Sequence, residues 1–295
     1  MLEYIVKPEE ADRRVRDILR RSMKISYSSM KNAKWNGQIL LNGEKAWADE
    51  RVAAGDRITV EWPEQVPVYQ PVPFILPLKI PYQDQHLIIV DKPAPLASQG
   101  SAKHPKNSLE NAIYSHLGCP ENFIYRPVNR LDKGTSGLMV IALTAHAQDL
   151  LQRQLHTEDF QREYLALTEG VPDPAEGVLD YPIAKMHEAT VRRCVRKNGK
   201  PARTRYRVLA EKDGRALVRL ALETGRTHQI RVHLSHIGCP VCGDFLYGTE
   251  LPAEFPGRFA LHSAFLDLRH PMTGVRIHLE SIPDFAMEIS QGTFL

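Results

Sequence analysis

One short stretch of the sequence combines residue types that can do covalent chemistry at neutral pH. Residues 126–143 read RPVNRLDKGTSGLMVIAL, and Asp132 stands there close to the cations Arg130 and Lys133. Nearby cations favour the ionised form of a carboxyl group, and an ionised carboxylate can act as a nucleophile or as a general base. The alternative is a turn aspartate in a surface ion pair, and spacing alone favours that alternative.

The residues around Asp132 predict that it lies on a loop at the edge of a strand. Pro127 favours extended backbone, and Gly134 and Gly137 permit tight turns before the apolar run SGLMVIAL, which is typical of a buried strand. After this strand, TAHAQDLLQRQL has apolar residues at helical spacing behind a Thr144 cap.

A second stretch, ETGRTHQIRVHLSHIGCP, is predicted to form a helix that holds Arg231 in a fixed position. Thr227 can cap this helix, Ile230 and Leu234 would face inward, and Gly238 would end it. Because apolar residues also alternate here, a strand is the alternative. A guanidinium fixed on such an element can orient a carboxylate, whereas an ordinary surface arginine would not.

The length of the chain and its prolines predict two domains. A chain of 295 residues is long enough for two, and residues 64–83 contain five prolines, which favour an extended segment. We therefore expect a small domain over residues 1–63, a Pro-rich linker over 64–79 and a large domain over 80–295.

The small domain is predicted to contain two helices followed by short strands. ADRRVRDILRR places Val15 and Leu19 on one helical face, and SYSSMKNAKWNG offers serine caps and Gly37 as a terminator. Asn42-Gly43 between apolar runs predicts a hairpin turn, and AAGDRITVEW a last strand.

The large domain is predicted to be α+β with a mixed, mostly antiparallel sheet. HLIIVDKP, REYLALTEG, RALVRLALETG and VRIHLESI are all strand-like, so strands outnumber helices and do not follow a regular βαβ order.

Composition and charge exclude several classes of protein. Hydrophobic residues make up 43% and charged residues 25%, which is ordinary globular usage. No apolar run reaches the roughly 18 residues of a membrane span, and the first residues lack an apolar signal core. Four cysteines do not indicate a disulfide framework. We expect a cytoplasmic protein without a membrane partner, and a monomer.

The net charge of +3 is small, but one segment is strongly basic. Lys185–Arg207 contains nine basic residues against Glu188 as its one acid. A solvated hairpin and a surface that contacts phosphates both fit this segment, and charge alone does not decide between them. The nine are Lys185, Arg192, Arg193, Arg196, Lys197, Lys200, Arg203, Arg205 and Arg207.

No metal site, nucleotide site or organic cofactor is predicted. Cys239 and Cys242 have metal-ligand spacing but no second pair, so they are expected to fill small buried positions. Three histidines between His228 and His236 lack an HExxH pattern, and no Gly-rich phosphate loop is present.

Beyond these patterns, RLDKGTSGL is very similar to the signature of the RluA/RluD family of pseudouridine synthases. DQHLIIVDKPAPL, QREYLALTEG, KPARTRYRVL, ETGRTHQIRVHLSHIGCPVCGDFLYG and LHSAFLDLRHPMTG resemble further motifs of that family, in order, from about Ile80 to Phe285. The first domain resembles the S4 RNA-binding domain, with LNG where the pattern has VNG and Lys31 where many members have Arg.

The resemblance implies isomerisation of a uridine in structured RNA, without a cofactor. The base would be detached from its N-glycosidic bond and rejoined through C5, after flipping out of its stack. Asp132 would be the catalytic nucleophile or base, Tyr164 would stack on the base, and Arg231 would pair with Asp132. Without the family, Tyr164 is better explained as a core tyrosine. Arg130, Lys133, Arg226 and His228 are expected to bind substrate, and Arg16, Lys31, Arg192 and Arg193 to bind RNA.

The chain departs from the family at Asn129, where a histidine usually precedes RLD. This departure could change rate or substrate choice, and it is the one feature that supports a non-catalytic RNA-binding or ribosome-assembly factor. Large-subunit ribosomal RNA is the expected partner and transfer RNA the alternative. A metal-dependent hydrolase is a more distant alternative.

Overall fold

The computed structural model describes residues 1–63, 66–101, 105–155 and 157–290, and the chain divides into two compact units, Met1–Val68 and Tyr69–Leu295. The second unit therefore begins before residue 80, the predicted start of the large domain. Of the predicted linker 64–79, residues 64–65 lie outside the described residues.

Most of the predicted linker is attached to the second unit by hydrogen bonds. The backbone N–H of Phe74 donates to Ser115 Oγ at 2.7 Å, and Asn111 Nδ2 donates to the carbonyl of Val72 at 2.8 Å. Residues 66–78 form neither helix nor strand, and the prolines that predict this do not indicate what the segment packs against.

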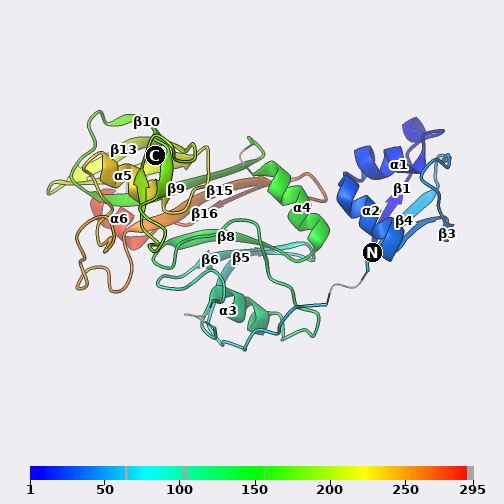
Figure 1. Cartoon of the computed structure of the whole chain (residues 1–295), viewed down its shortest axis with the longest axis horizontal. Helices are drawn as coiled ribbons and strands as arrows, with labels where there is room; N and C mark the ends of the chain where they lie inside the picture. Colours follow the sequence, from blue (N-terminus) through cyan, green and yellow to red (C-terminus); the bar gives the residue numbers. More distant parts are fainter. Residues whose placement is uncertain (64–65, 102–104, 156, 291–295) are drawn as a thin grey trace. The chain divides into compact units, whose positions relative to one another are not determined.

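The first unit is a small α+β module with a four-stranded antiparallel sheet in the order β1-β4-β2-β3. A π-helical turn continues α1 (Figure 1). Strand β1 precedes the helices and is missing from the sequence prediction. The elements are β1 (Leu2–Ile5), α1 (Val15–Asp17), α2 (Tyr27–Asn36), β2 (Gln38–Leu41), β3 (Glu44–Lys45) and β4 (Arg57–Glu61).

The predicted caps and turn of this unit are confirmed. Ser26 caps α2 by accepting a hydrogen bond from the N–H of Ser29 at 3.1 Å. Gly37 ends α2 where a Cβ would lie 2.0 Å from the carbonyl oxygen of Glu61. Asn42 and Gly43 both have positive φ, 53° and 91°, as a two-residue hairpin turn of type I′ requires.

The second unit is built on a ten-stranded sheet in the order β10-β13-β14-β9-β15-β8-β6-β5, with β16 paired to β15 and β7 to β8. Among the strand pairs of the described residues, only β15–β8 is parallel, so the predicted fold class is confirmed. The strands are β5 (Lys79–Gln83), β6 (Leu87–Lys92), β7 (Arg126–Pro127), β8 (Ser136–Ala142), β9 (Phe160–Glu169), β10 (Glu176–Asp180), β13 (Arg203–Lys212), β14 (Arg215–Leu222), β15 (Leu261–Arg269) and β16 (Arg276–Glu280).

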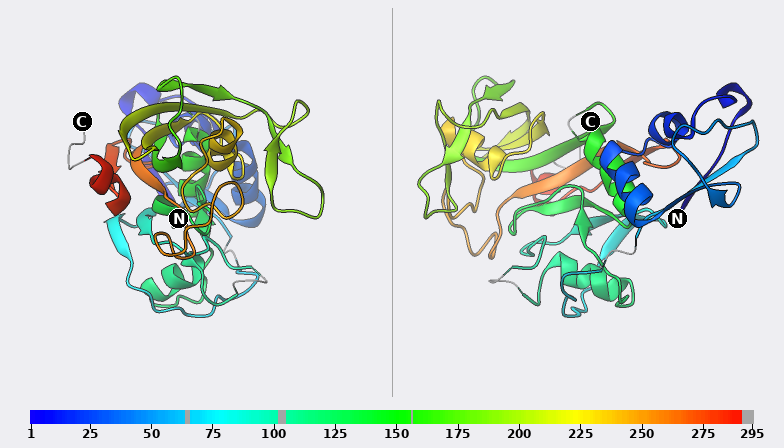
Figure 2. Two further views of the ribbon diagram at one scale, coloured as in Figure 1. Left: turned by 90° about the vertical axis from the view of Figure 1, so that its left-hand side faces the viewer. Right: turned by 45° about the vertical axis from the view of Figure 1, so that its right-hand side comes forward.

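Helices cover both faces of this sheet (Figures 1 and 2). Alternate residues of β6 and β8 belong to two different cores: Val90 packs in the core that contains α3 (Leu109–His116), and Ile89 packs in the core that contains α4 (Ala145–Gln154). Both strands are therefore buried on both faces, which explains their continuous apolar runs. Thr144 caps α4 as predicted, accepting from the N–H of Ala147.

The remaining elements lie beyond the sheet: a separate hairpin, β11 (Ile183–Lys185) with β12 (Arg193–Val195), and the helices α5 (Gln229–His236) and α6 (Asp284–Ser290). No helix in the described ranges is both long enough and apolar enough to span a membrane.

Candidate active site

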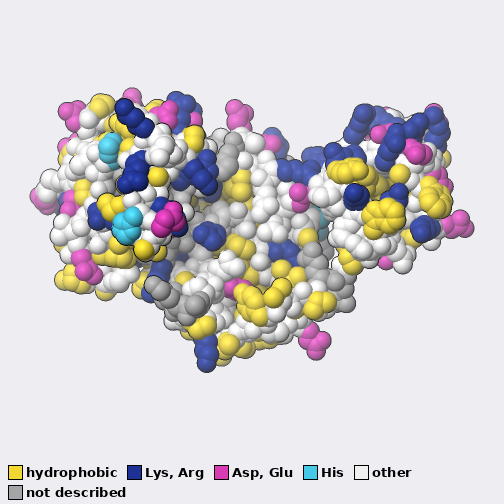
Figure 3. All heavy atoms as spheres, in the orientation of Figure 1, with side chains coloured by type: hydrophobic (Ala, Val, Ile, Leu, Met, Phe, Trp, Pro, Cys, Tyr) yellow, Lys and Arg dark blue, Asp and Glu magenta, His cyan; other side chains and the backbone are white. Residues whose placement is uncertain are grey.

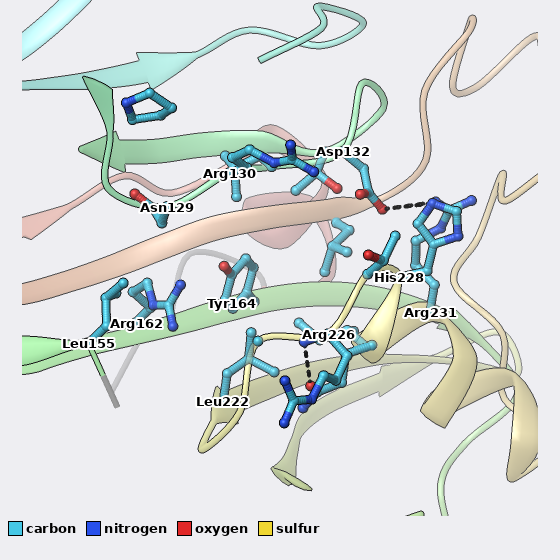
Figure 4. Close-up of a pocket in the computed structure, with 18 of the residues that line it drawn as sticks. Asn129, Arg130, Asp132, Leu155, Arg162, Tyr164, Leu222, Arg226, His228 and Arg231 are labelled. Atoms are coloured by element: carbon cyan, nitrogen blue, oxygen red, sulfur yellow. Dashed lines mark hydrogen bonds and ion pairs between the residues drawn. The ribbon is translucent and has the colours of Figure 1, made fainter. Parts of the chain in front are cut away.

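A pocket of about 370 Å³ opens in the second unit where three segments meet: the loop before β8, strand β9 and the start of α5. Figure 4 shows Asp132 joined to Arg231 on one side of this pocket, with Asn129, Leu155 and Arg162 on the opposite side of the view. The predicted site residues that line it are Arg130, Asp132, Tyr164, Arg226, His228 and Arg231. Lys133 does not.

The loop that carries Asp132 is fixed from both ends. Ser98 Oγ donates to the carbonyl of Leu131 at 2.6 Å and accepts from the N–H of Leu131 at 3.2 Å. Gly134 passes so close to the ring of Phe259 that a Cβ would lie 2.6 Å from it. The carboxylate of Asp132, 29% exposed, is therefore presented from a rigid turn.

Arg231 joins Asp132 to a second, fully buried carboxylate. Its Nη1 donates to Asp132 Oδ2 at 2.9 Å, while its Nε and Nη2 donate to the two oxygens of Asp244 at 2.6 and 2.8 Å. The guanidinium also lies 4.2 Å from the ring centroid of Phe259 and 5.0 Å from that of Tyr247. Burial alone would lower the pKa of Arg231, but the bonds to Asp244 and Asp132 outweigh burial and raise it. The arginine is thus permanently charged and held in one orientation.

Residues 229–236 are helical, so the predicted helix is confirmed and the strand alternative is wrong. The predicted cap is also wrong: the N-cap is His228, with a left-handed backbone (φ 58°), and not Thr227. The side chain of Gln229 explains the difference, because its Oε1 accepts from the N–H of Arg226 at 2.9 Å and its Nε2 donates to the carbonyl of Arg203 at 3.0 Å.

His228 faces the carboxylate of Asp132. Its Nε2 lies 3.8 Å from Asp132 Oδ2, and its Nδ1 lies 2.8 Å from the hydroxyl of Tyr247. Burial lowers the pKa of His228, against the opposing attraction of Asp132. The imidazole is therefore neutral near pH 7.

Tyr164 is a buried strand residue that also lines the pocket. It lies on β9 opposite Leu220 of β14 and Ser263 of β15, and its exposure is only 4%. Burial raises the pKa of its phenol, so the hydroxyl stays protonated at neutral pH. Tyr164 is therefore a core residue, as the strand pattern predicts, and it also lines the pocket; its stacking on a base stays a prediction.

Three residues of the site were not predicted: Arg162, which lines the pocket, and Asp244 and Tyr247, which contact the lining residues Arg231 and His228. Arg162 lines the pocket two residues before Tyr164, and its buried Nε finds no partner among the described residues. Since alternate strand residues share a face, the position of Tyr164 could have indicated it. Asp244 and Tyr247 lie in a turn, where no periodicity points to either of them.

Asn129 has a structural contact at the position where the family usually has histidine. Its Oδ1 accepts from the N–H of Val140 at 2.9 Å, and its buried Nδ2 has no partner within the described ranges. The side chain lines the pocket and joins the loop that carries Asp132 to β8.

The basic residues predicted to contact RNA lie outside this pocket. Arg192 and Arg193 belong to the β11–β12 hairpin, while Arg16 lies on α1, where it pairs with Asp49 at 2.8 Å, and Lys31 lies on α2. In Figure 3 the first unit shows many Lys and Arg side chains beside exposed hydrophobic ones.

The cysteines behave as predicted, since Cys239 and Cys242 are buried and unbridged. In the part of the chain that the structure describes, no three His, Cys, Asp or Glu side chains gather closely enough to hold a metal ion.

Comparison with known proteins adds independent information about this site. Residues 86–236 match the family described as RNA pseudouridylate synthase. The chain is 35% identical over 245 residues to the uncharacterized RNA pseudouridine synthase YjbO of Bacillus subtilis, covering 82% of this chain and 86% of YjbO. It is 37% identical over 274 residues to ribosomal large subunit pseudouridine synthase D of Pseudomonas aeruginosa, covering 86% and 84%.

A solved structure is also similar. Human RNA pseudouridylate synthase domain containing 1 superimposes with a TM-score of 0.58 at 26% identity, covering 72% of this chain and 86% of the human chain. The matched family segment contains Asp132, Tyr164 and Arg231.

Proposed function

The chain belongs to the RluA/RluD family of RNA pseudouridine synthases, and from this premise we propose that it isomerises a uridine of large-subunit ribosomal RNA with Asp132 as the catalytic carboxylate. The observation that carries the assignment is the contact of Asp132 with Arg231 at the end of a pocket. The choice of ribosomal RNA is supported by the relative whose name states that substrate.

Asp132 suits the role of a nucleophile or base. It is partly exposed to the pocket and held in place by the hydrogen bond from Arg231 Nη1. In the reaction the N1–C1′ bond breaks and a C5–C1′ bond forms, while the proton leaves C5 and N1 gains one, so no atom is added or lost. Asp132 is the only carboxylate among the described residues that line this pocket.

The rest of the pocket suits a flipped nucleotide. A cavity of about 370 Å³ on the protein surface is reached by a base only after it leaves its stack. The ring of Tyr164 offers a surface for the uracil, and its protonated hydroxyl can donate a hydrogen bond. Arg130, Arg162 and Arg226 surround this surface with cations that can meet ribose oxygens and phosphates.

We assign the first unit, S4-like in sequence, and the β11–β12 hairpin to RNA binding outside the pocket. Lys31 on α2 and the arginines Arg16, Arg192 and Arg193 supply the cations that would contact phosphates. Structured RNA is recognised largely by shape and backbone, so such contacts can raise affinity without touching the target uridine.

Mapping of pseudouridine across total RNA tests the proposal. A strain that lacks the gene is complemented with the wild-type protein, with Asp132→Asn, or with Asp159→Asn as a matched control. Asp159 is also a carboxylate paired with an arginine, at 2.6 Å from Arg269, but it lies on the surface away from the pocket. We expect sites in large-subunit ribosomal RNA to vanish in the deletion strain and to return with the wild type and Asp159→Asn only. Restoration by Asp132→Asn would refute its catalytic role, and sites confined to transfer RNA would refute the assigned substrate.

A further inference from the structure

Tyr247 lies where the basic hairpin meets the active site. Its hydroxyl accepts a hydrogen bond from the backbone N–H of Arg193 at 2.8 Å and lies 2.8 Å from His228 Nδ1. Its ring is flanked by two guanidinium groups, with centroid distances of 5.0 Å to Arg231 and 5.6 Å to Arg192. The hydroxyl is therefore fixed on one side by the hairpin and directed at the imidazole on the other.

The hydrogen bonds of this hydroxyl indicate the tautomer of His228. A phenol has one proton to donate, and the oxygen of Tyr247 already accepts from the hairpin. Among the described hydrogen bonds of this hydroxyl, Nδ1 of His228 is the available acceptor, so Nδ1 carries the lone pair. The proton of the neutral ring then lies on Nε2, the nitrogen that is 3.8 Å from Asp132 Oδ2.

The surroundings of His228 favour the same arrangement. An N–H beside a carboxylate is favourable, whereas a bare nitrogen lone pair in that place would be repelled. The groups that act on the imidazole are Asp132 from the loop before β8, Arg231 from α5, Asp244 and Tyr247 from the turn after α5, and Arg193 from β12. The residue also has a left-handed backbone (φ 58°), which a non-glycine residue seldom adopts unless its surroundings impose it.

We propose that Tyr247 is a positioning residue that holds His228 as the Nε2–H tautomer, so that this N–H faces the carboxylate of Asp132. The inference rests on the proposed function for its kinetic consequence, but the tautomer itself belongs to the protein without RNA. Tyr247 acts through His228 and has no contact with the reacting atoms.

The Tyr247→Phe variant removes the hydroxyl and keeps the ring between the two arginines. Because the hydrogen bond to His228 Nδ1 is lost together with the one from the hairpin, we expect kcat to fall about tenfold and the KM for RNA to change less than about twofold. The neutral imidazole loses the donor that stabilised it, so His228 becomes protonated at a higher pH, and the acid limb of the pH–rate profile moves to higher pH. In a His228→Ala background, Tyr247→Phe should have no further effect on kcat.

Tyr206→Phe is the matched control, because Tyr206 is a strand residue whose hydroxyl donates to the carbonyl of Pro174 at 2.8 Å, outside the pocket. It should keep the wild-type kcat and pH profile. A merely structural role for Tyr247 would lower the melting temperature of Tyr247→Phe but leave the acid limb where it is, and that result would overturn the proposal.

Nitrogen-15 NMR of histidine-labelled protein gives a readout that needs no RNA. We expect the Nε2–H tautomer for His228 in the wild type and in Tyr206→Phe, and a loss of that preference in Tyr247→Phe. A wild-type protein with the Nδ1–H tautomer would refute the assignment. If the wild type shows the Nε2–H tautomer but forms no pseudouridine, the proposed function fails while the positioning role of Tyr247 stands.

Discussion

Replacing Asp244 by asparagine separates stability from chemistry within one ion-pair network. Arg231 is 3% exposed and Asp244 is 0% exposed, and two of the three bonds from the guanidinium go to Asp244. Oδ1 of Asp244 also accepts from the N–H groups of Leu246 and Tyr247 at 3.0 and 3.3 Å. Asp244→Asn keeps the size of the side chain but removes the charge that balances the buried arginine.

The burial and contacts of Asp244 and Asp132 set how much stability each replacement should cost. Removing one partner of a buried ion pair costs about 3–5 kcal/mol of stability. Because Arg231 keeps its contact with Asp132, Asp244→Asn should lie at the lower end of this range. For a unit of this size, that loss lowers the melting temperature by about 6–12 °C. Asp132→Asn is the matched control: its partner stays paired with Asp244, so a cost of about 1 kcal/mol or less, or about 2–4 °C, is expected.

Thermal unfolding by circular dichroism and single-turnover formation of pseudouridine measure the two effects. We expect Asp132→Asn to be nearly as stable as the wild type and inactive, and Asp244→Asn to be clearly less stable with residual activity below its transition. If Asp132→Asn were the less stable of the two, the account of Arg231 as an arginine held mainly by Asp244 would be wrong.

Three further predictions concern pH, packing and charge. Burial lowers the pKa of His262 to about 4, so below about pH 6.5 the unfolded chain binds more protons than the folded chain. About 3 kcal/mol of stability should therefore be lost between pH 6.5 and 4. Denaturant titrations across this range should show a smaller loss of stability for His262→Gln. Gly134→Ala should push against Phe259 and cost about 1–3 kcal/mol, with a loss of activity; an unchanged denaturation midpoint would contradict the close contact. Arg192→Ala should reduce the slope of log affinity against log salt by about 1 if that side chain meets a phosphate, and an unchanged slope would exclude the contact.

The sequence predicted correctly those elements whose structure depends on neighbouring residues. Strand β8 and helix α4 are predicted from an apolar run, a Thr144 cap and helical spacing, all of which act within a few residues. Residues Asn42 and Gly43 predict their turn for the same reason, since positive φ is a property of the residues themselves.

The sequence did not predict features that depend on contacts between distant segments of the chain. Asp244, the buried partner of Arg231, lies in a turn that has no periodic sequence pattern. The sequence analysis therefore did not predict the bond between Asp244 and Arg231. Thr227 is a good cap by residue type, yet Gln229 bonds to Arg203 on a neighbouring strand and shifts the start of α5. Assignment of Asp132 itself depended on the resemblance, because its spacing alone fits an ordinary turn.

The place of β15 in the sheet has a consequence for how the protein matures. Strands β6 and β8 hold the loop with Asp132, whereas β9 and β14 hold Tyr164 and lead to α5, and β15 is the strand that joins the two groups. Of the described strands, only β16 leaves the ribosome after β15. The two groups of strands therefore cannot pair into one sheet until Leu261–Arg269 has been synthesised and inserted between them. Until then each group has an unpaired edge strand. A growing chain therefore displays Asp132, Tyr164 and Arg231 before β15 exists, and the pocket that they line should form only after Leu261–Arg269 has been synthesised.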